Sequence, residues 1–197
     1  KSFFRVEEIG SIEIISGEPS NDWKLTRKKG EADYILVDAT EEEVLDQNKV
    51  SSMKSAFSNP QMEDVFVGEE KKENKPEGTT FKITTFDGFR YEVSVGEKND
   101  LNELPLSLKV SAKFQEKRKE GEEESDEEKE RLDKAFADEL AQKLEKLASE
   151  KSLEGHVFKV RSYIVDSITK KRSELLEEKE EEEAGGGPEI APGVTLP

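Results

Sequence analysis

The strongest constraint on the fold of this chain is the alternation of apolar and polar side chains between residues 79 and 114. From Leu104 to Phe114 every even position is apolar, and the run Phe89–Val95 alternates in the same way. A period of two is typical of a strand with one buried face, so neighbouring strands are predicted here. Asp87-Gly88 separates two of the runs and favours a hairpin with a type I′ turn, in which both central residues need positive φ.

Further strands are predicted on either side of this block. A second hairpin runs from Ile12–Ile14 to Trp23–Arg27 through a turn at Gly17–Asp22, and Tyr34–Val37 forms a third strand. A last strand pattern covers residues 156–168.

A short and a long helix are predicted from apolar spacing and caps. Asp46 caps a segment whose Val50, Met53 and Phe57 form one stripe, which Asn59-Pro60 ends. The long helix opens with a capping box at Ser125-Asp-Glu-Glu128, and Gly155 is a fitting stop. We expect this helix to dock on the sheet through five large side chains: Leu132, Phe136, Leu140, Leu144 and Leu147.

A third helix is predicted from Ser167 to about Lys179, starting after Asp166. It would present three apolar side chains: Ile168, Leu175 and Leu176.

These elements predict an α+β fold, in which an antiparallel-rich sheet built from hairpins is covered by two or three amphipathic helices. Residues 1–68 form its first part, and the polar bridge Glu69–Gly78 leads to a strand-rich second part at 79–176, with an inserted charged helix at about 115–154. Residues 177–197 are acidic and contain Gly and Pro, so a disordered tail is predicted there.

Charge and composition exclude several classes of function. The 197 residues carry 31 Lys and Arg against 47 Asp and Glu, a net charge of −16, which opposes binding to nucleic acid. The chain contains no Cys, so it has no thiolate nucleophile and no zinc–thiolate or iron–sulfur ligand. No apolar run reaches the length of about 18 residues typical of a membrane span.

No catalytic, cofactor or metal residues are predicted. His156 is the only histidine and is interpreted as a strand-edge residue, so a hydrolase that relies on it and a Ser is the last of three hypotheses. The acidic clusters lack the Gly-containing order of a calcium loop and are interpreted as solvated charge. Lys170-Lys-Arg172 is a compact basic cluster and is expected to balance nearby Glu.

Three aromatic residues carry an alternative hypothesis. Trp23, Tyr34 or Tyr91 would serve as a platform in a cell-envelope module that binds glycan or peptide. Trp23 is favoured as a core anchor instead, because its alternation partner Leu25 is also apolar. Burial of the three rings would remove the platform hypothesis.

One ordered set of motifs runs along the chain: Ile12-Glu-Ile14, Trp23-Lys-Leu25, the helix 46–57, Asp64-Val65, the segment 81–89 and the segment 165–176. This set resembles domain of unknown function 4340, in forms of the verrucomicrobial type. The resemblance covers most of residues 6–176, and its motifs are structural, so it transfers no catalytic residue. A charged bridge replaces the family's Gly-Leu-x-x-Pro segment, and residues 115–152 look like an insertion.

The resemblance implies a location and a kind of partner. Family members are typically anchored by an N-terminal membrane helix, face outside the cytoplasm, and are encoded beside ABC-transporter or gliding-type components. We therefore expect the soluble part of an inner-membrane-anchored accessory protein on the periplasmic face, with an anchor that precedes Lys1. Its function would be non-enzymatic interaction with a protein partner, such as a subunit of the transporter.

Overall fold

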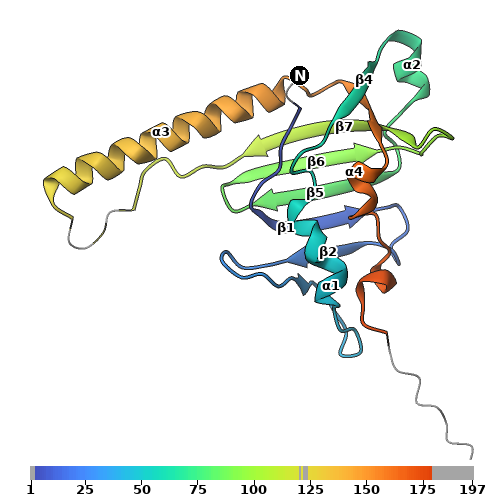
Figure 1. The fold of residues 1–197 in the computed structure, drawn as a ribbon, viewed down its shortest axis with the longest axis horizontal. Coiled ribbons are helices and arrows are strands. Elements are labelled where there is room, and N and C mark those ends of the chain that lie inside the picture. The colour runs from blue at the N-terminus through green and yellow to red at the C-terminus, as the bar shows by residue number, and fades with distance from the viewer. Residues whose placement is uncertain (1–2, 120, 122–123, 179–197) are drawn as a thin grey trace, which may run out of the picture.

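The computed structural model describes residues 3–119, 121 and 124–178, and its centre is one antiparallel sheet of eight strands (Figure 1). The order of the strands in the sheet is β3-β2-β1-β5-β6-β7-β8-β4. Short helices lie over one face, so the predicted α+β class is confirmed. The strands are β1 (Ile9–Ile15), β2 (Trp23–Thr26), β3 (Ile35–Leu36), β4 (Met62–Phe66), β5 (Thr79–Thr85), β6 (Phe89–Val95), β7 (Glu103–Ala112) and β8 (Val157–Arg161).

The predicted alternation sets the register of the central strands. In β6 the side chains of Phe89, Tyr91, Val93 and Val95 are all buried, whereas those between them are exposed or half-buried. Tyr91 lies opposite Ile83 of β5 and Val110 of β7, so the apolar residues of adjacent strands share one face. A shift by one residue would expose the whole apolar row, which is why the pattern fixes the pairing.

The hairpin at Asp87-Gly88 is confirmed, but the predicted type I′ turn is wrong. Thr84 pairs with Arg90, which leaves a loop of three residues between Thr85 and Phe89. Gly88 has φ +101°, and Asp87 is not among the residues with positive φ. The Gly88 amide donates to the Thr85 carbonyl at 3.3 Å, so a type I turn followed by a left-handed Gly closes the hairpin. A Cβ at Gly88 would lie 2.5 Å from the Lys113 carbonyl oxygen.

The N-terminal third of the chain supplies both edges of the sheet. The hairpin β1–β2 and the edge strand β3 form as predicted, with Ile14 opposite Trp23 and Leu25 opposite Leu36. Strand β4 was not predicted, and it lies at the opposite edge, where Phe66 pairs with Val157 of β8. The last strand is shorter than its predicted range of 156–168.

A layer of short helices and extended chain covers the apolar face of the sheet (Figure 1). Asp46 caps α1 (Gln47–Val50) by accepting from the amides of Asn48 and Lys49, and α1 continues into η1 (Ser51–Ser55). The predicted stripe is confirmed, since its three side chains are at most 3% exposed. The rest of this layer consists of the segment before β1, α4 (Tyr163–Asp166) and η2 (Arg172–Leu175).

The predicted third helix over 167–179 is wrong for the residues that are described. Ile168 and Leu175 are buried as expected, but they lie on either side of an extended stretch between α4 and η2. Lys170 in this stretch accepts a hydrogen bond of 2.7 Å from Trp23 Nε1, and a continuous helix would use that carbonyl itself.

Two other segments differ from or lie beyond the predictions. The bridge predicted at Glu69–Gly78 includes most of a helix, α2 (Gly68–Glu73), which has no buried residue. The disordered tail predicted for 177–197 lies outside the described residues, apart from Glu177 and Glu178.

Candidate functional site

The most prominent feature outside the sheet is an arm inserted between β7 and β8. It consists of α3 (Asp126–Lys151) and the chain that leads to it, and α3 projects far beyond the sheet (Figure 1). Its start is fixed as predicted, because Ser125 Oγ accepts from the Glu128 amide and the Glu128 carboxylate accepts from the Ser125 amide. The chain leaves the helix through a turn at Gly155, where φ is +79°.

The chain before α3 is tied to the helix by one guanidinium. Arg118 donates to both carboxylate oxygens of Glu124, at 2.5 and 2.6 Å, and to Asp133 of α3 at 2.9 Å. Hydrogen bonds from Arg118 lower the pKa of Glu124 to about 2. These contacts hold the chain before α3 against the outer half of the helix.

The root of the arm is held by a buried carboxylate. Glu150 is 5% exposed, and it accepts from the Arg5 amide at 2.9 Å and from the Tyr91 hydroxyl at 2.9 Å. Burial raises the pKa of this carboxyl above its ordinary value, while the two hydrogen bonds act in the opposite direction. Glu154 adds a second tie by accepting from the Val110 amide at 2.8 Å, beyond the stretch of β7 that pairs with β8.

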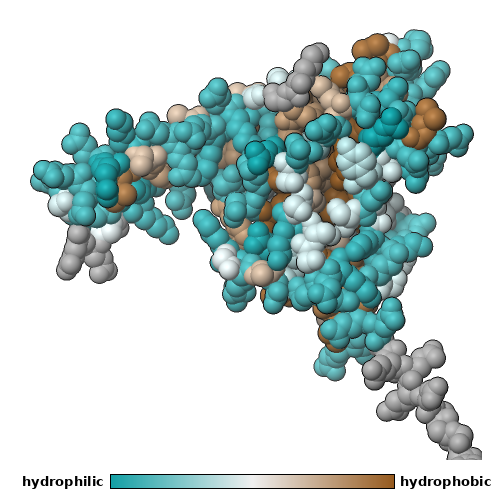
Figure 2. All heavy atoms as spheres, in the orientation of Figure 1, coloured by the Kyte–Doolittle hydropathy of each residue, from teal (hydrophilic) through white to brown (hydrophobic). Residues whose placement is uncertain are grey.

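The long helix is predicted to dock on the sheet along its whole apolar face, but only part of that face is buried. Leu132, Phe136, Leu140 and Leu147 are only half-buried, and Leu144 is 51% exposed. Burying a large apolar side chain contributes about 1.5–3 kcal/mol, and α3 realises only part of this within the described chain. Figure 2 shows hydrophilic side chains over most of the arm, with hydrophobic ones near its free end.

A groove of about 730 Å³ lies between the arm and the end of the sheet. Half-buried apolar side chains of Phe86, Phe114, Phe136 and Leu140 line it. Phe86 is fixed in place by the Arg27 guanidinium, which lies 5.0 Å from the centre of its ring. The groove therefore offers an apolar surface that strands and helix both hold in position.

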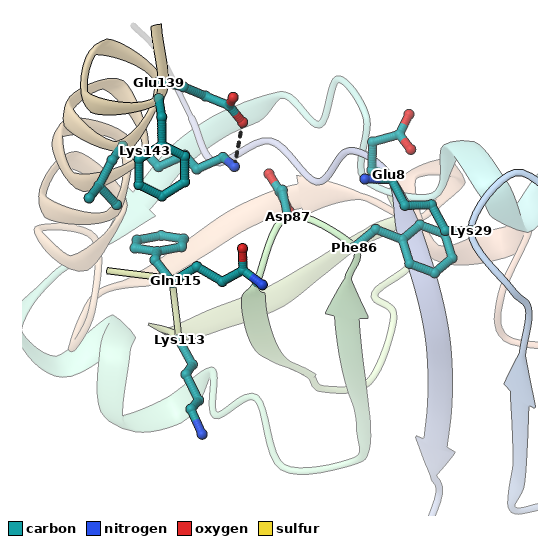
Figure 3. A pocket seen from close by; sticks show the side chains of 12 residues that line it. Glu8, Lys29, Phe86, Asp87, Lys113, Gln115, Glu139 and Lys143 are labelled. Carbon is teal, nitrogen blue, oxygen red and sulfur yellow. Dashed lines mark ion pairs between the residues drawn. The ribbon is translucent and has the colours of Figure 1, made fainter. Parts of the chain in front are cut away.

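The rim of the groove carries charges of both signs (Figure 3). Glu139 and Lys143 on α3 form an ion pair at 2.6 Å, and Asp87 at the hairpin tip faces them from the other side of the groove. The hydrogen bond from Lys143 lowers the pKa of Glu139. Lys113 points away from the groove in this view. The apolar side chains between these charges suit the binding of a chain segment that is apolar on one side and charged at its flanks.

The three aromatic residues of the alternative hypothesis are all buried. Trp23 is 3% exposed, and Tyr34 and Tyr91 are each 2% exposed. Trp23 uses its indole N–H to bind the Lys170 carbonyl, and Tyr91 stacks on Phe89 inside the core. None of these rings offers a face to a ligand, so Trp23 acts as a core anchor.

The other candidate groups lie apart from one another. His156 is exposed next to β8, and its Nδ1 lies 3.3 Å from the Leu153 carbonyl. In the predicted basic cluster, Arg172 pairs with Glu43 at 2.7 Å and lowers the pKa of that carboxyl to about 2. Across residues 3–119, 121 and 124–178, no group of three or more His, Asp or Glu is arranged to hold a metal ion.

Sequence reasoning missed the groove itself. Its residues come from the hairpin tip, the chain after β7 and the middle of α3, which are far apart in the sequence. The sequence indicates the Asp87-Gly88 turn and the apolar stripe of the helix separately. Whether the two lie side by side depends on the direction in which α3 leaves its root at Glu150.

Comparison of the chain with protein-family models, with curated proteins and with solved structures found no match. Among the described helices, none combines the length and the apolar character that crossing a membrane requires.

Proposed function

We propose that this chain is a non-enzymatic interaction domain that binds a protein partner through its projecting arm. The observation that carries the proposal is the apolar stripe of α3, which stays partly open over the groove and includes the exposed Leu144. A helix that buries so little of its apolar face within its own chain is typical of a surface that another chain covers.

The charge around this stripe defines the chemistry of the partner. The outer half of α3, residues 126–139, carries seven carboxylates against three cationic side chains. An amphipathic partner segment with apolar residues on one side and Lys or Arg at its flanks complements both features. The proposed partner is such a segment in the extracytoplasmic part of a transporter subunit.

The system and the compartment follow from the sequence resemblance. On that basis the chain is the soluble part of a membrane-anchored accessory protein of an ABC-transporter or gliding-type system, facing the periplasm. The burial of Trp23, Tyr34 and Tyr91 gives no support to the glycan-platform alternative.

Two single substitutions on α3 test the proposal. Leu144→Glu places a charge on the open stripe, while Gln142→Glu places one about 160° away around the same helix. Both positions are exposed, so neither change disturbs the core. The full-length protein is purified from cross-linked cell envelopes, and recovered transporter subunits are quantified by mass spectrometry.

The expected result is recovery of transporter subunits with the wild type and with Gln142→Glu, and at least fivefold less with Leu144→Glu. Equal recovery with both variants would remove the arm from the interface. Failure of the wild type to recover any transporter subunit in several detergents would overturn the proposed partner.

A further inference from the structure

The face of the sheet opposite the covering layer carries an ordered row of charges. In the order β2, β1, β5, β6, β7, residues directly opposite one another are Lys24, Glu13, Lys82, Glu92 and Lys109. The charges alternate in sign along this row. Because adjacent strands are about 4.8 Å apart, each charged side chain lies close to an oppositely charged one. The outer members form ion pairs, Lys24–Glu13 at 3.3 Å and Lys109–Glu92 at 2.7 Å.

Two cations on this face are not used by these pairs. Lys82 lies between the two carboxylates in register, but it makes no ion pair within the described chain. Arg90 lies in the next row between Thr84 and Ser111, and it likewise has no carboxylate or carbonyl partner among the described residues. Cross-strand pairing accounts for the outer charges of the row but not for Arg90.

The surplus of cations is unusual for this molecule. Four cationic side chains and two carboxylates lie together on this part of the face, although the whole chain has a net charge of −16. These side chains surround a shallow hollow of about 540 Å³ in the sheet surface. The hydroxyls of Ser11, Thr84 and Ser111 also line it. A guanidinium fork beside hydroxyl donors is the arrangement that recognises planar or tetrahedral oxyanions.

We infer that this hollow binds a single oxyanionic group, of the phosphate, sulfate or carboxylate type, on a ligand that is otherwise uncharged. Arg90 is the main donor, the hydroxyls of Thr84 and Ser111 flank it, and Lys82 adds positive charge from the neighbouring strand. Glu13 and Glu92 oppose a densely charged polyanion, because such a ligand would meet their carboxylates within the same row. The site is separate from the arm and does not depend on the function proposed for it.

The test is a titration of the full-length protein followed by amide chemical shifts at constant ionic strength. The probes are inorganic phosphate, glucose 6-phosphate and glucuronate, with chloride as the reference anion. Arg90→Gln removes the proposed donor, and Arg131→Gln removes the same charge from the exposed surface of the arm. Both positions are exposed, so both variants are expected to fold.

The expected result is a saturable shift at Thr84, Arg90 and Ser111 with at least one probe. Arg90→Gln should weaken this binding at least fivefold, whereas Arg131→Gln should leave it unchanged. Tighter binding of a sugar-borne probe than of inorganic phosphate supports a group carried by a larger ligand, whereas tighter binding of inorganic phosphate would overturn that part of the inference. Shifts that do not saturate, or equal affinity of Arg90→Gln and the wild type, would overturn the inference.

Discussion

The tie between the arm and the sheet makes Tyr91→Phe a sensitive probe of the structure. The Tyr91 hydroxyl donates to Glu150 Oε2 at 2.9 Å and lies 3.3 Å from the Arg5 carbonyl oxygen, and both Tyr91 and Glu150 are buried. A hydrogen bond to a charged group contributes about 1.5–3 kcal/mol, so we expect the free energy of unfolding to fall by that amount. For a chain of this length the loss corresponds to a decrease in Tm of about 3–12 °C.

Tyr34→Phe is the matched control for this substitution. Tyr34 is as buried as Tyr91, but its hydroxyl has no hydrogen-bond partner among the described residues. Removing it should change the free energy of unfolding by about 1 kcal/mol or less, in the stabilising direction. Urea denaturation can be followed by the fluorescence of Trp23, the one tryptophan, which is buried. Equal losses in the two variants would show that the hydroxyl of Tyr91 does not hold the arm.

Three further outcomes are expected. Because burial raises the pKa of Glu150 above 4.5, stability should fall as the pH rises from about 4.5 through the folded-state pKa, and Glu150→Gln should flatten this slope in urea titrations. Hydrogen bonds from Arg172, and then from the Thr40 amide, hold the pKa of Glu43 at about 2, so its contribution to stability is present above 4.5 and lost toward pH 2. In Arg172→Gln, carboxyl chemical shifts should report a pKa raised toward 4.5, and an unchanged pKa would contradict the ion pair. Gly88→Ala should lower the free energy of unfolding by about 1–3 kcal/mol, because φ is +101° and the new Cβ would meet the Lys113 carbonyl; wild-type stability would count against this turn geometry.

The central strands were predictable because one physical requirement decides them. A sheet with a single buried face needs apolar residues at every second position, and the segments at β5, β6 and β7 satisfy it in sequence. The caps at Asp46 and Ser125 were predictable for a similar reason, since each one uses side chains within three residues of the helix start.

The errors arise where distant contacts compete with local preference. The spacing of Ile168 and Leu175 suits a helix, but the indole of Trp23 takes the Lys170 carbonyl and the chain stays extended. Strand β4 has no regular alternation, and it becomes a strand because β8 offers it an edge.

The candidate site was less predictable than the fold. The apolar stripe of α3 was visible, but the sequence could not say whether the sheet or another molecule covers it. The answer depends on the direction in which the helix leaves Glu150. Nothing in the apolar spacing of the helix indicates that this carboxylate is buried.

The pairing of β4 with β8 also has a consequence for how the chain reaches its native state. Phe66 pairs with Val157, so this edge of the sheet can form only after about 90 further residues have been synthesised. At about 5–20 residues per second, a ribosome needs roughly 5–20 s to synthesise that interval. Premature termination ahead of β8 would therefore release a nascent polypeptide with an uncompleted sheet, a substrate for chaperones and proteases rather than a smaller stable protein.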